Sequence, residues 1–249
     1  MAMDSDRRAS LLCLLLLTAF TTASSIRLML PESSSGKVSL VLYYETLCPY
    51  CSNFIVNYLD KLFADDELIE IVDLKLVPYG NAKISSNGTI ICQHGNWECV
   101  LNTIETCAID VLPSLKEHFP FIYCVETLVY QHQYTEWTQC FDKLGVDPKP
   151  IMECYNNGRG TELELQYAAE TGSLQPPHKY VPWVTVNGEP LYDDYENFVA
   201  YICKAYKGST APNTCSSLSL KNAPRTGGNS ELKACTQEAE IIEMPIASM

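Results

Sequence analysis

The first strong pattern in the chain is an apolar run over Val38–Tyr44, dense in β-branched, aliphatic and aromatic side chains. Such a run is typical of a strand that is buried on both faces. Soon after it comes Cys48-Pro49, and proline is favoured at the first position of a helix. Apolar residues then recur at helical spacing from Phe54, so we expect a helix that runs to about Phe63.

The same alternation between strand and helix patterns continues along the chain. A second strand is expected over 69–77, and the order strand, helix, strand implies a right-handed parallel crossover. Strand character returns at 181–186, and Asn-Gly at 187–188 predicts a tight hairpin into 189–192. An amphipathic helix over about 195–206 would cover the resulting sheet.

The segment between these two halves has a different pattern. From 81 to about 176, apolar residues recur at helical spacing between turns, and six of the cysteines lie there. This pattern favours a helical insertion stapled by disulfides. The chain is therefore expected to form one α/β domain over 38–206 that carries this insertion. Residues 207–249 are rich in Ser, Thr, Pro, Gly and Asn, which predicts a flexible tail or a propeptide.

The two ends of the chain and its charge restrict where the protein acts. Residues 1–25 carry two arginines, an apolar run and small residues, which is the pattern of a signal peptide. A membrane anchor is the alternative, but the apolar run is too short to span a bilayer, and no membrane span is expected. The net charge of −13 leaves no electrostatic basis for binding nucleic acid. We expect a protein of the secretory pathway that is secreted or delivered to a lysosome or vacuole.

Cysteine number adds a further constraint. Removal of Cys13 with the signal peptide would leave eleven of the twelve cysteines. Most cysteines of an exported chain should be paired. An odd number means that at least one is free, is joined to another chain, or lies in a segment that is later removed. The sequence does not determine which cysteines pair.

The segment Cys48-Pro49-Tyr50-Cys51 is the main candidate for chemistry. A sulfur at the start of a helix lies against unpaired backbone amides and the positive end of the helix dipole, which stabilise a thiolate. We therefore predict that Cys48 is the nucleophile and that Cys51 is the resolving thiol of a thiol–disulfide exchange. A structural bridge between the two cysteines and half of a zinc site are the alternatives.

A proline at the start of an expected core strand is the second candidate. Pro182 follows Val181, and a proline there requires either an edge strand or a cis peptide bond. In proteins of the thioredoxin type, a cis-proline at this place faces the dithiol, and its neighbour pairs with the bound substrate. Both interpretations remain open on position alone.

A third cluster spans 92–107, with cysteines at 92, 99 and 107 and a histidine at 94. This spacing matches no zinc template, so structural disulfides are favoured over a metal site. His94 is either a pH-sensitive group near the substrate or a surface histidine. Separately, Asn87-Gly88-Thr89 is a sequon for N-glycosylation of Asn87.

Taken together, these motifs resemble the gamma-interferon-inducible lysosomal thiol reductase family. The resemblance rests on three stretches, namely 48–51, the Cys-Gln-His-Gly…Cys signature that begins at 92, and 178–188. It implies a thioredoxin-like fold with inserted helices, Cys48 and Cys51 in the catalytic positions, and Pro182 as the cis-proline. It also implies reduction of protein disulfides at acidic pH.

We therefore expect a thiol oxidoreductase that reduces disulfides of partly unfolded protein substrates. A small thiol or a protein would supply the electrons, and no metal or organic cofactor is expected. The alternative is a disulfide-rich binding or structural protein in which Cys48–Cys51 is an inert bridge. The two prolines at 49 and 182 favour the enzyme, because a redox site needs both.

Overall fold

The structure, a computed structural model, describes residues 36–217 and 233–237. The expected signal peptide lies outside these residues. The described part of the chain contains no helix that is both long and apolar enough to cross a membrane.

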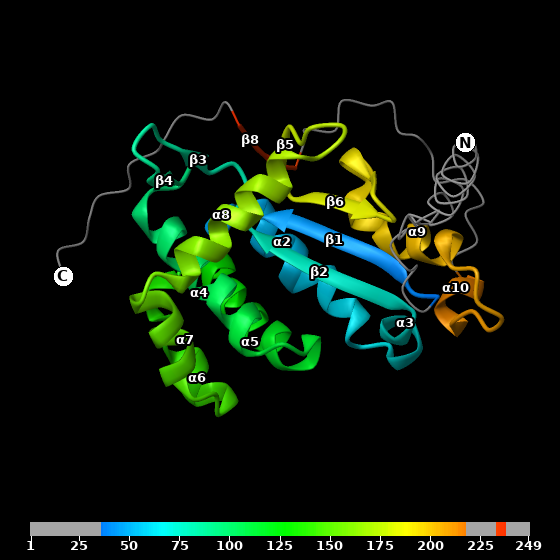
Figure 1. The fold of residues 1–249 in the computed structure, drawn as a ribbon. Coiled ribbons are helices and arrows are strands. Elements are labelled where there is room, and N and C mark those ends of the chain that lie inside the picture. The colour runs from blue at the N-terminus through cyan, green and yellow to red at the C-terminus, as the bar shows by residue number, and fades with distance from the viewer. Residues whose placement is uncertain (1–35, 218–232, 238–249) are drawn as a thin grey trace, which may run out of the picture. The chain divides into compact units, whose positions relative to one another are not determined.

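A four-stranded sheet with the order β2-β1-β6-β7 forms the centre of the domain (Figure 1). Its strands are β1 (Val38–Tyr44), β2 (Val72–Pro78), β6 (Trp183–Val186) and β7 (Glu189–Pro190). β1 pairs in parallel with β2 and antiparallel with β6, and β6 pairs antiparallel with β7. The Asn-Gly turn between β6 and β7 has positive φ at both residues, as a tight hairpin requires. The expected parallel pairing of the first two strands and the expected antiparallel hairpin are both present.

The helices that connect β1 to β2 are shorter than the sequence predicted. They are α2 (Pro49–Asn57), a 3-10 helix (Leu59–Leu62) and α3 (Asp66–Glu70). Asp65 caps α3, because its carboxylate accepts hydrogen bonds from the backbone N–H groups of Glu67 and Leu68. This cap holds residues 69 and 70 in a helix, so the second strand begins at Val72 instead of residue 69.

The helical insertion is present, and it is stapled as expected. It comprises the short strands β3 (Lys83–Ile84) and β4 (Ile90–Ile91) and the helices α4 (Asn96–Val111), α5 (Leu115–Tyr130), α6 (Gln139–Leu144), α7 (Pro148–Asn156) and α8 (Arg159–Gly172). A 3-10 helix covers Tyr134–Glu136. Disulfides Cys107–Cys154 and Cys124–Cys140 join α4 to α7 and α5 to α6. These helices enclose a hydrophobic core of their own beside the core of the sheet.

The other end of the domain is closed by aromatic packing. The expected final helix consists of a 3-10 helix (Tyr192–Asn197) and α9 (Phe198–Ala205). Phe54 of α2 packs edge-to-face on Tyr195 and Phe198, with ring centroids 5.3 and 5.5 Å apart. This contact fixes α2 against the segment that follows the sheet.

Two pieces of the segment expected as a flexible tail are regular parts of the fold. Helix α10 (Asn213–Ser217) is joined to α9 by the disulfide Cys203–Cys215. Strand β8 (Cys235–Thr236) pairs antiparallel with β5 (Tyr180–Val181). Composition predicted flexibility here, but disulfides and strand pairing are long-range contacts that composition does not contain.

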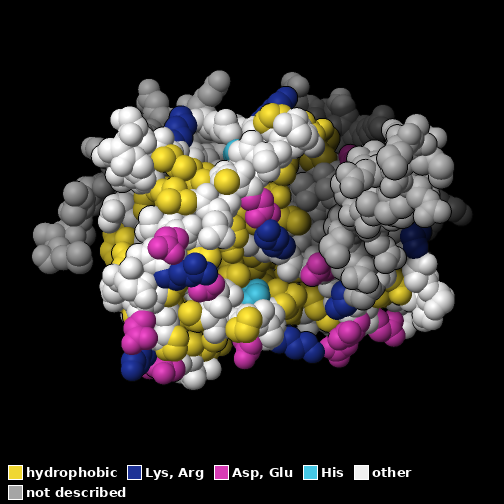
Figure 2. All heavy atoms as spheres, in the orientation of Figure 1, with side chains coloured by type: hydrophobic (Ala, Val, Ile, Leu, Met, Phe, Trp, Pro, Cys, Tyr) yellow, Lys and Arg dark blue, Asp and Glu magenta, His cyan; other side chains and the backbone are white. Residues whose placement is uncertain are grey.

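The surface carries both acidic and basic side chains. Figure 2 shows acidic and basic side chains interspersed with apolar ones on the face that it presents, with no single large patch of either sign. Among the exposed apolar residues are Ile84 and Ile91, which are 48% and 46% exposed on β3 and β4.

Buried carboxyl groups lie between the sheet and the insertion. Glu105 of α4 and Glu126 of α5 are both fully buried, and the hydroxyl of Tyr44 donates a hydrogen bond of 2.6 Å to Glu105. Burial raises the pKa of Glu105 from 4.5 to about 8. Burial and the charge of Glu105 together raise the pKa of Glu126 well above its ordinary value. These groups are therefore neutral in the folded chain at acidic pH.

This arrangement predicts that stability falls as the pH rises. The folded-state pKa of Glu105 is about 8, against 4.5 for the same group exposed to solvent in the unfolded chain, so the folded chain holds a proton that the unfolded chain releases. The stabilisation is complete below pH 4.5 and is lost as the pH rises to about 8. This one group lowers the free energy of unfolding by up to about 1.4 kcal/mol per pH unit in that range.

We expect the thermal unfolding midpoint, followed by circular dichroism, to decrease across this pH range. Glu105→Gln should flatten the profile, because an amide keeps the hydrogen bond from Tyr44 without titrating. Glu153→Gln is the matched control, since that side chain is 65% exposed. A parent profile that rises with pH would contradict the prediction.

Candidate active site

Cys48 lies at the N-terminus of α2, as predicted. It is the capping residue of the helix, and Pro49 occupies the first helical position. Its backbone carbonyl accepts hydrogen bonds of 3.1 Å from the N–H groups of both Cys51 and Ser52. Cys48 therefore lies in the short segment after β1, at the end of helix α2 that carries positive partial charge.

The structure places Cys48 beside Val181 and Pro182. The Sγ atom of Cys48 is 3.9 Å from the carbonyl oxygen of Val181. The peptide bond between Val181 and Pro182 is cis, which confirms the expectation. Residues about 130 positions apart in the chain therefore meet at one place, next to strand β5.

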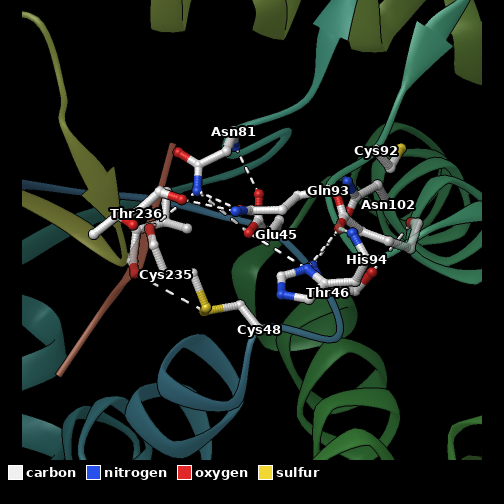
Figure 3. Close-up of polar contacts among 12 residues, drawn as sticks. Glu45, Thr46, Cys48, Asn81, Cys92, Gln93, His94, Asn102, Cys235 and Thr236 are labelled. Carbon is white, nitrogen blue, oxygen red and sulfur yellow. Dashed lines mark hydrogen bonds and ion pairs between the residues drawn. A yellow bond between two sulfur atoms is a disulfide. The ribbon is translucent and has the colours of Figure 1, made fainter. Parts of the chain in front are cut away.

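Cys48 forms a disulfide with Cys235 and not with Cys51 (Figure 3). Strand β8 carries Cys235 and lies along β5, with Cys235 opposite Val181. Cys48 is fully buried in this arrangement. The Cys48–Cys51 bridge that the structural alternative requires is absent from the described residues.

Cys51 is the free cysteine of the described part of the chain, and it is fully buried. Burial is the main cause that raises the pKa of its thiol well above the ordinary value, and the charge of Glu45 adds to it. The Cys51 thiol therefore stays protonated over the physiological pH range and is inaccessible from solvent.

Glu45 is a buried carboxyl group at the end of β1. Its Oε2 accepts a 2.6 Å hydrogen bond from the backbone N–H of Asn81. Burial, followed by the charge of Glu98, raises the pKa of Glu45 well above its ordinary value. Gly80 has φ +60, and a Cβ atom there would lie 2.3 Å from Glu45 Oε2, so only glycine fits.

Residues of the 92–107 signature lie beside Glu45. The disulfides Cys92–Cys99 and Cys107–Cys154 give its three cysteines structural roles. His94 is 22% exposed at its side chain, and its Nδ1 lies 2.7 Å from Glu98 and 3.5 Å from Glu45. His94 therefore lies in the site region and is not a plain surface residue.

One group of side chains has the composition of a metal site. Potential ligand atoms of Glu45, His94 and Cys235 lie within 4.8 Å of one another. The sulfur of Cys235 is already bonded to that of Cys48, so it offers no thiolate to a cation.

For three residues of this region, the sequence predicted no role in the site. Besides Cys235, they are Asn81, whose side-chain Nδ2 donates a 3.0 Å hydrogen bond to the carbonyl of Cys235, and Gln93, whose Nε2 donates one of 2.7 Å to the carbonyl of Thr236. The odd cysteine count was the one available signal for Cys235. Gln93 belongs to the signature that begins at 92, but that pattern does not indicate its bond to Thr236, and nothing local distinguishes Asn81 from other polar loop residues.

Comparison with known proteins identifies relatives of the chain. Residues 39–144 match the family model described as gamma interferon inducible lysosomal thiol reductase. A gamma-interferon-responsive lysosomal thiol protein of Arabidopsis thaliana is 48% identical over 217 residues, which cover 85% of this chain and 87% of the relative. The gamma-interferon-inducible lysosomal thiol reductase of Mus musculus is 39% identical over 201 residues, covering 79% and 77%.

Among solved structures, the chain is similar to two proteins named DsbA. The protein of Chlamydia trachomatis aligns with a TM-score of 0.47 and 13% identity, covering 66% of this chain and 86% of that one. The protein of Xylella fastidiosa aligns with a TM-score of 0.42 and 20% identity, covering 66% and 82%.

Proposed function

Because the chain belongs to the gamma-interferon-inducible lysosomal thiol reductase family, we propose that it reduces disulfide bonds of protein substrates through the Cys48/Cys51 dithiol. The protein is a thiol–disulfide oxidoreductase. The observation that carries the proposed roles is the arrangement at the site. Cys48 is bonded to a cysteine of a strand that lies along β5, while Cys51 is held free and buried close by. This is the arrangement of a mixed disulfide that awaits resolution, with the tail in the place of a substrate.

The reaction follows in two exchange steps. The thiolate of Cys48 attacks one sulfur of the substrate disulfide, and the other substrate sulfur leaves as a thiolate. Cys51 then loses its proton and attacks Cys48 Sγ, which releases the second substrate thiol and leaves a Cys48–Cys51 disulfide. A small thiol or a reduced protein supplies two electrons to restore the dithiol. The substrate is reduced by two electrons in each cycle.

The raised pKa of the Cys51 thiol supports this division of roles. A buried and protonated thiol does not compete with Cys48 for the first attack. Val181 and Pro182 are the proposed substrate-binding residues, since β5 already accepts an extended segment beside Cys48. Partly unfolded proteins fit this site, because a cysteine must enter it on an extended chain.

The bond between Cys48 and Cys235 must open before a substrate can react. The same reductant that renews the dithiol would open it, releasing Cys235 as a thiol. Removal of the tail as a propeptide would not open this bond by itself, because the fragment that carries Cys235 stays joined to Cys48 until the disulfide is reduced.

We further propose that the protein acts in an acidic compartment of the secretory pathway, or after secretion. The expected signal peptide supports export, and the buried carboxyl groups support stability in acid. The family relatives from Arabidopsis thaliana and Mus musculus are named as lysosomal.

The proposed roles predict opposite behaviour of two variants. In the Cys235→Ser background, after reduction, removal of the reductant and addition of a disulfide-bonded protein, Cys51→Ser should accumulate substrate-linked species, because Cys48 attacks and neither Cys51 nor Cys235 can resolve the product. Cys48→Ser should accumulate none. Non-reducing electrophoresis with mass mapping measures both, and equal trapping by the two variants would mean that the roles are wrong. A protein of the structural class would trap substrate in neither.

Activity in acid predicts a low pKa for the Cys48 thiol. At about pH 5, a thiol with a pKa of about 8.5 is ionised in only about one molecule in three thousand. We expect the position of Cys48 at the helix N-terminus to favour the thiolate, and the raised pKa of Glu45 keeps that neighbouring carboxyl group neutral in acid.

The pKa can be measured from the alkylation rate as a function of pH in the double variant Cys51→Ser, Cys235→Ser, where Cys48 is the free thiol. We expect a value clearly below that of an ordinary thiol. The triple variant with Cys48→Ser gives the background rate. A value at or above about 8 would exclude the acid mechanism.

We also propose N-glycosylation of Asn87. This residue is exposed in the turn between β3 and β4, where an enzyme can reach it. Glycosidase treatment of the exported protein should reduce its intact mass, and Asn87→Gln should abolish that difference. An unchanged mass for the parent protein would refute the proposal.

A further inference from the structure

The tail strand is held by more than its disulfide and its pairing with β5. Two side-chain amides, those of Asn81 and Gln93, donate hydrogen bonds to two consecutive main-chain carbonyls, at Cys235 and Thr236 (Figure 3). Both donors are buried, with 6% and 9% exposure. The contacts are made to the residue that is disulfide-bonded to Cys48 and to the residue that follows it.

We propose that Asn81 and Gln93 form an amide clamp that binds the main chain of polypeptide substrates. Its two donors would bind the carbonyl of the reacting cysteine and that of the next residue. The proposal rests on the proposed function, because it treats the tail as a stand-in for a substrate bonded to Cys48. Every substrate residue has a main-chain carbonyl, so the clamp selects polypeptide over small disulfides without selecting a sequence.

Each of the two amides is held in place by contacts with neighbouring residues. Asn81 is fixed by its backbone N–H bond to Glu45, and its Nδ2 also lies 2.7 Å from Oε1 of Gln93, which orients the second amide. Gln93 follows Cys92, whose disulfide with Cys99 anchors the loop to α4. This gives a role to the glutamine of the 92–107 signature. Because amides do not titrate, the donors persist in acid, where carboxyl groups change state.

The clamp can be tested by comparing two substrates in the full chain carrying Cys235→Ser, which removes the covalent competitor. One substrate is a disulfide-bonded protein, insulin, and the other is bis(2-hydroxyethyl) disulfide, which has no peptide bond. Gln93→Met keeps the side-chain length and removes the donor. We expect it to lower kcat/KM for insulin roughly fivefold more than for the small disulfide, the loss typical of one hydrogen bond.

Gln93→Leu, which also removes the donor, should lower the insulin rate at least as much and serves as the second variant if Gln93→Met is unstable. Gln139→Ala is the matched control, since its amide bonds Glu136 on the surface. Equal losses on both substrates, or no loss, would overturn the clamp. Failure of the Cys235→Ser parent to reduce either substrate would instead overturn the proposed function.

Discussion

The position of β1 at the centre of the sheet is the constraint on which the site depends. β1 is paired along both edges, with β2 on one side and β6 on the other. Its position is therefore fixed by two ladders of backbone hydrogen bonds and by the core on its faces. The loop after β1 carries Glu45 and Cys48, and the cis-proline loop enters β6 directly beside it. Two segments far apart in the chain thus meet because their strands are neighbours.

Much of this framework could be predicted because its signals are local. The apolar pattern of β1, the proline after Cys48 and the Asn-Gly hairpin each act within a few residues, and each appears in the structure where it was expected. The predicted ends of helices and strands were less accurate than the predicted elements themselves. The prediction missed the helix that Asp65 caps, so β2 begins at Val72 and not at residue 69, although an aspartate followed by acidic residues was visible in the sequence.

The long-range contacts could not be predicted. Disulfide pairing depends on which cysteines approach in three dimensions, and the bond from Cys48 to Cys235 spans 187 residues. The amides of Asn81 and Gln93 donate hydrogen bonds to β8, and the sequence around 81 and 93 does not indicate these contacts. Similarly, the burial of Glu105 and Glu126 follows from the packing of α4 and α5 on Tyr44. An isolated helix pattern cannot reveal that two acidic residues face one another in a core.

Strand β5 shows what the tail does besides engaging Cys48. β5 is only two residues long, and β8 is its partner strand in the described part of the chain. A strand edge without a partner exposes backbone groups that another chain can pair with, which is a route to aggregation. While β8 is in place, this edge is covered. Covered in this way, the edge of β5 is not available for pairing with another extended chain.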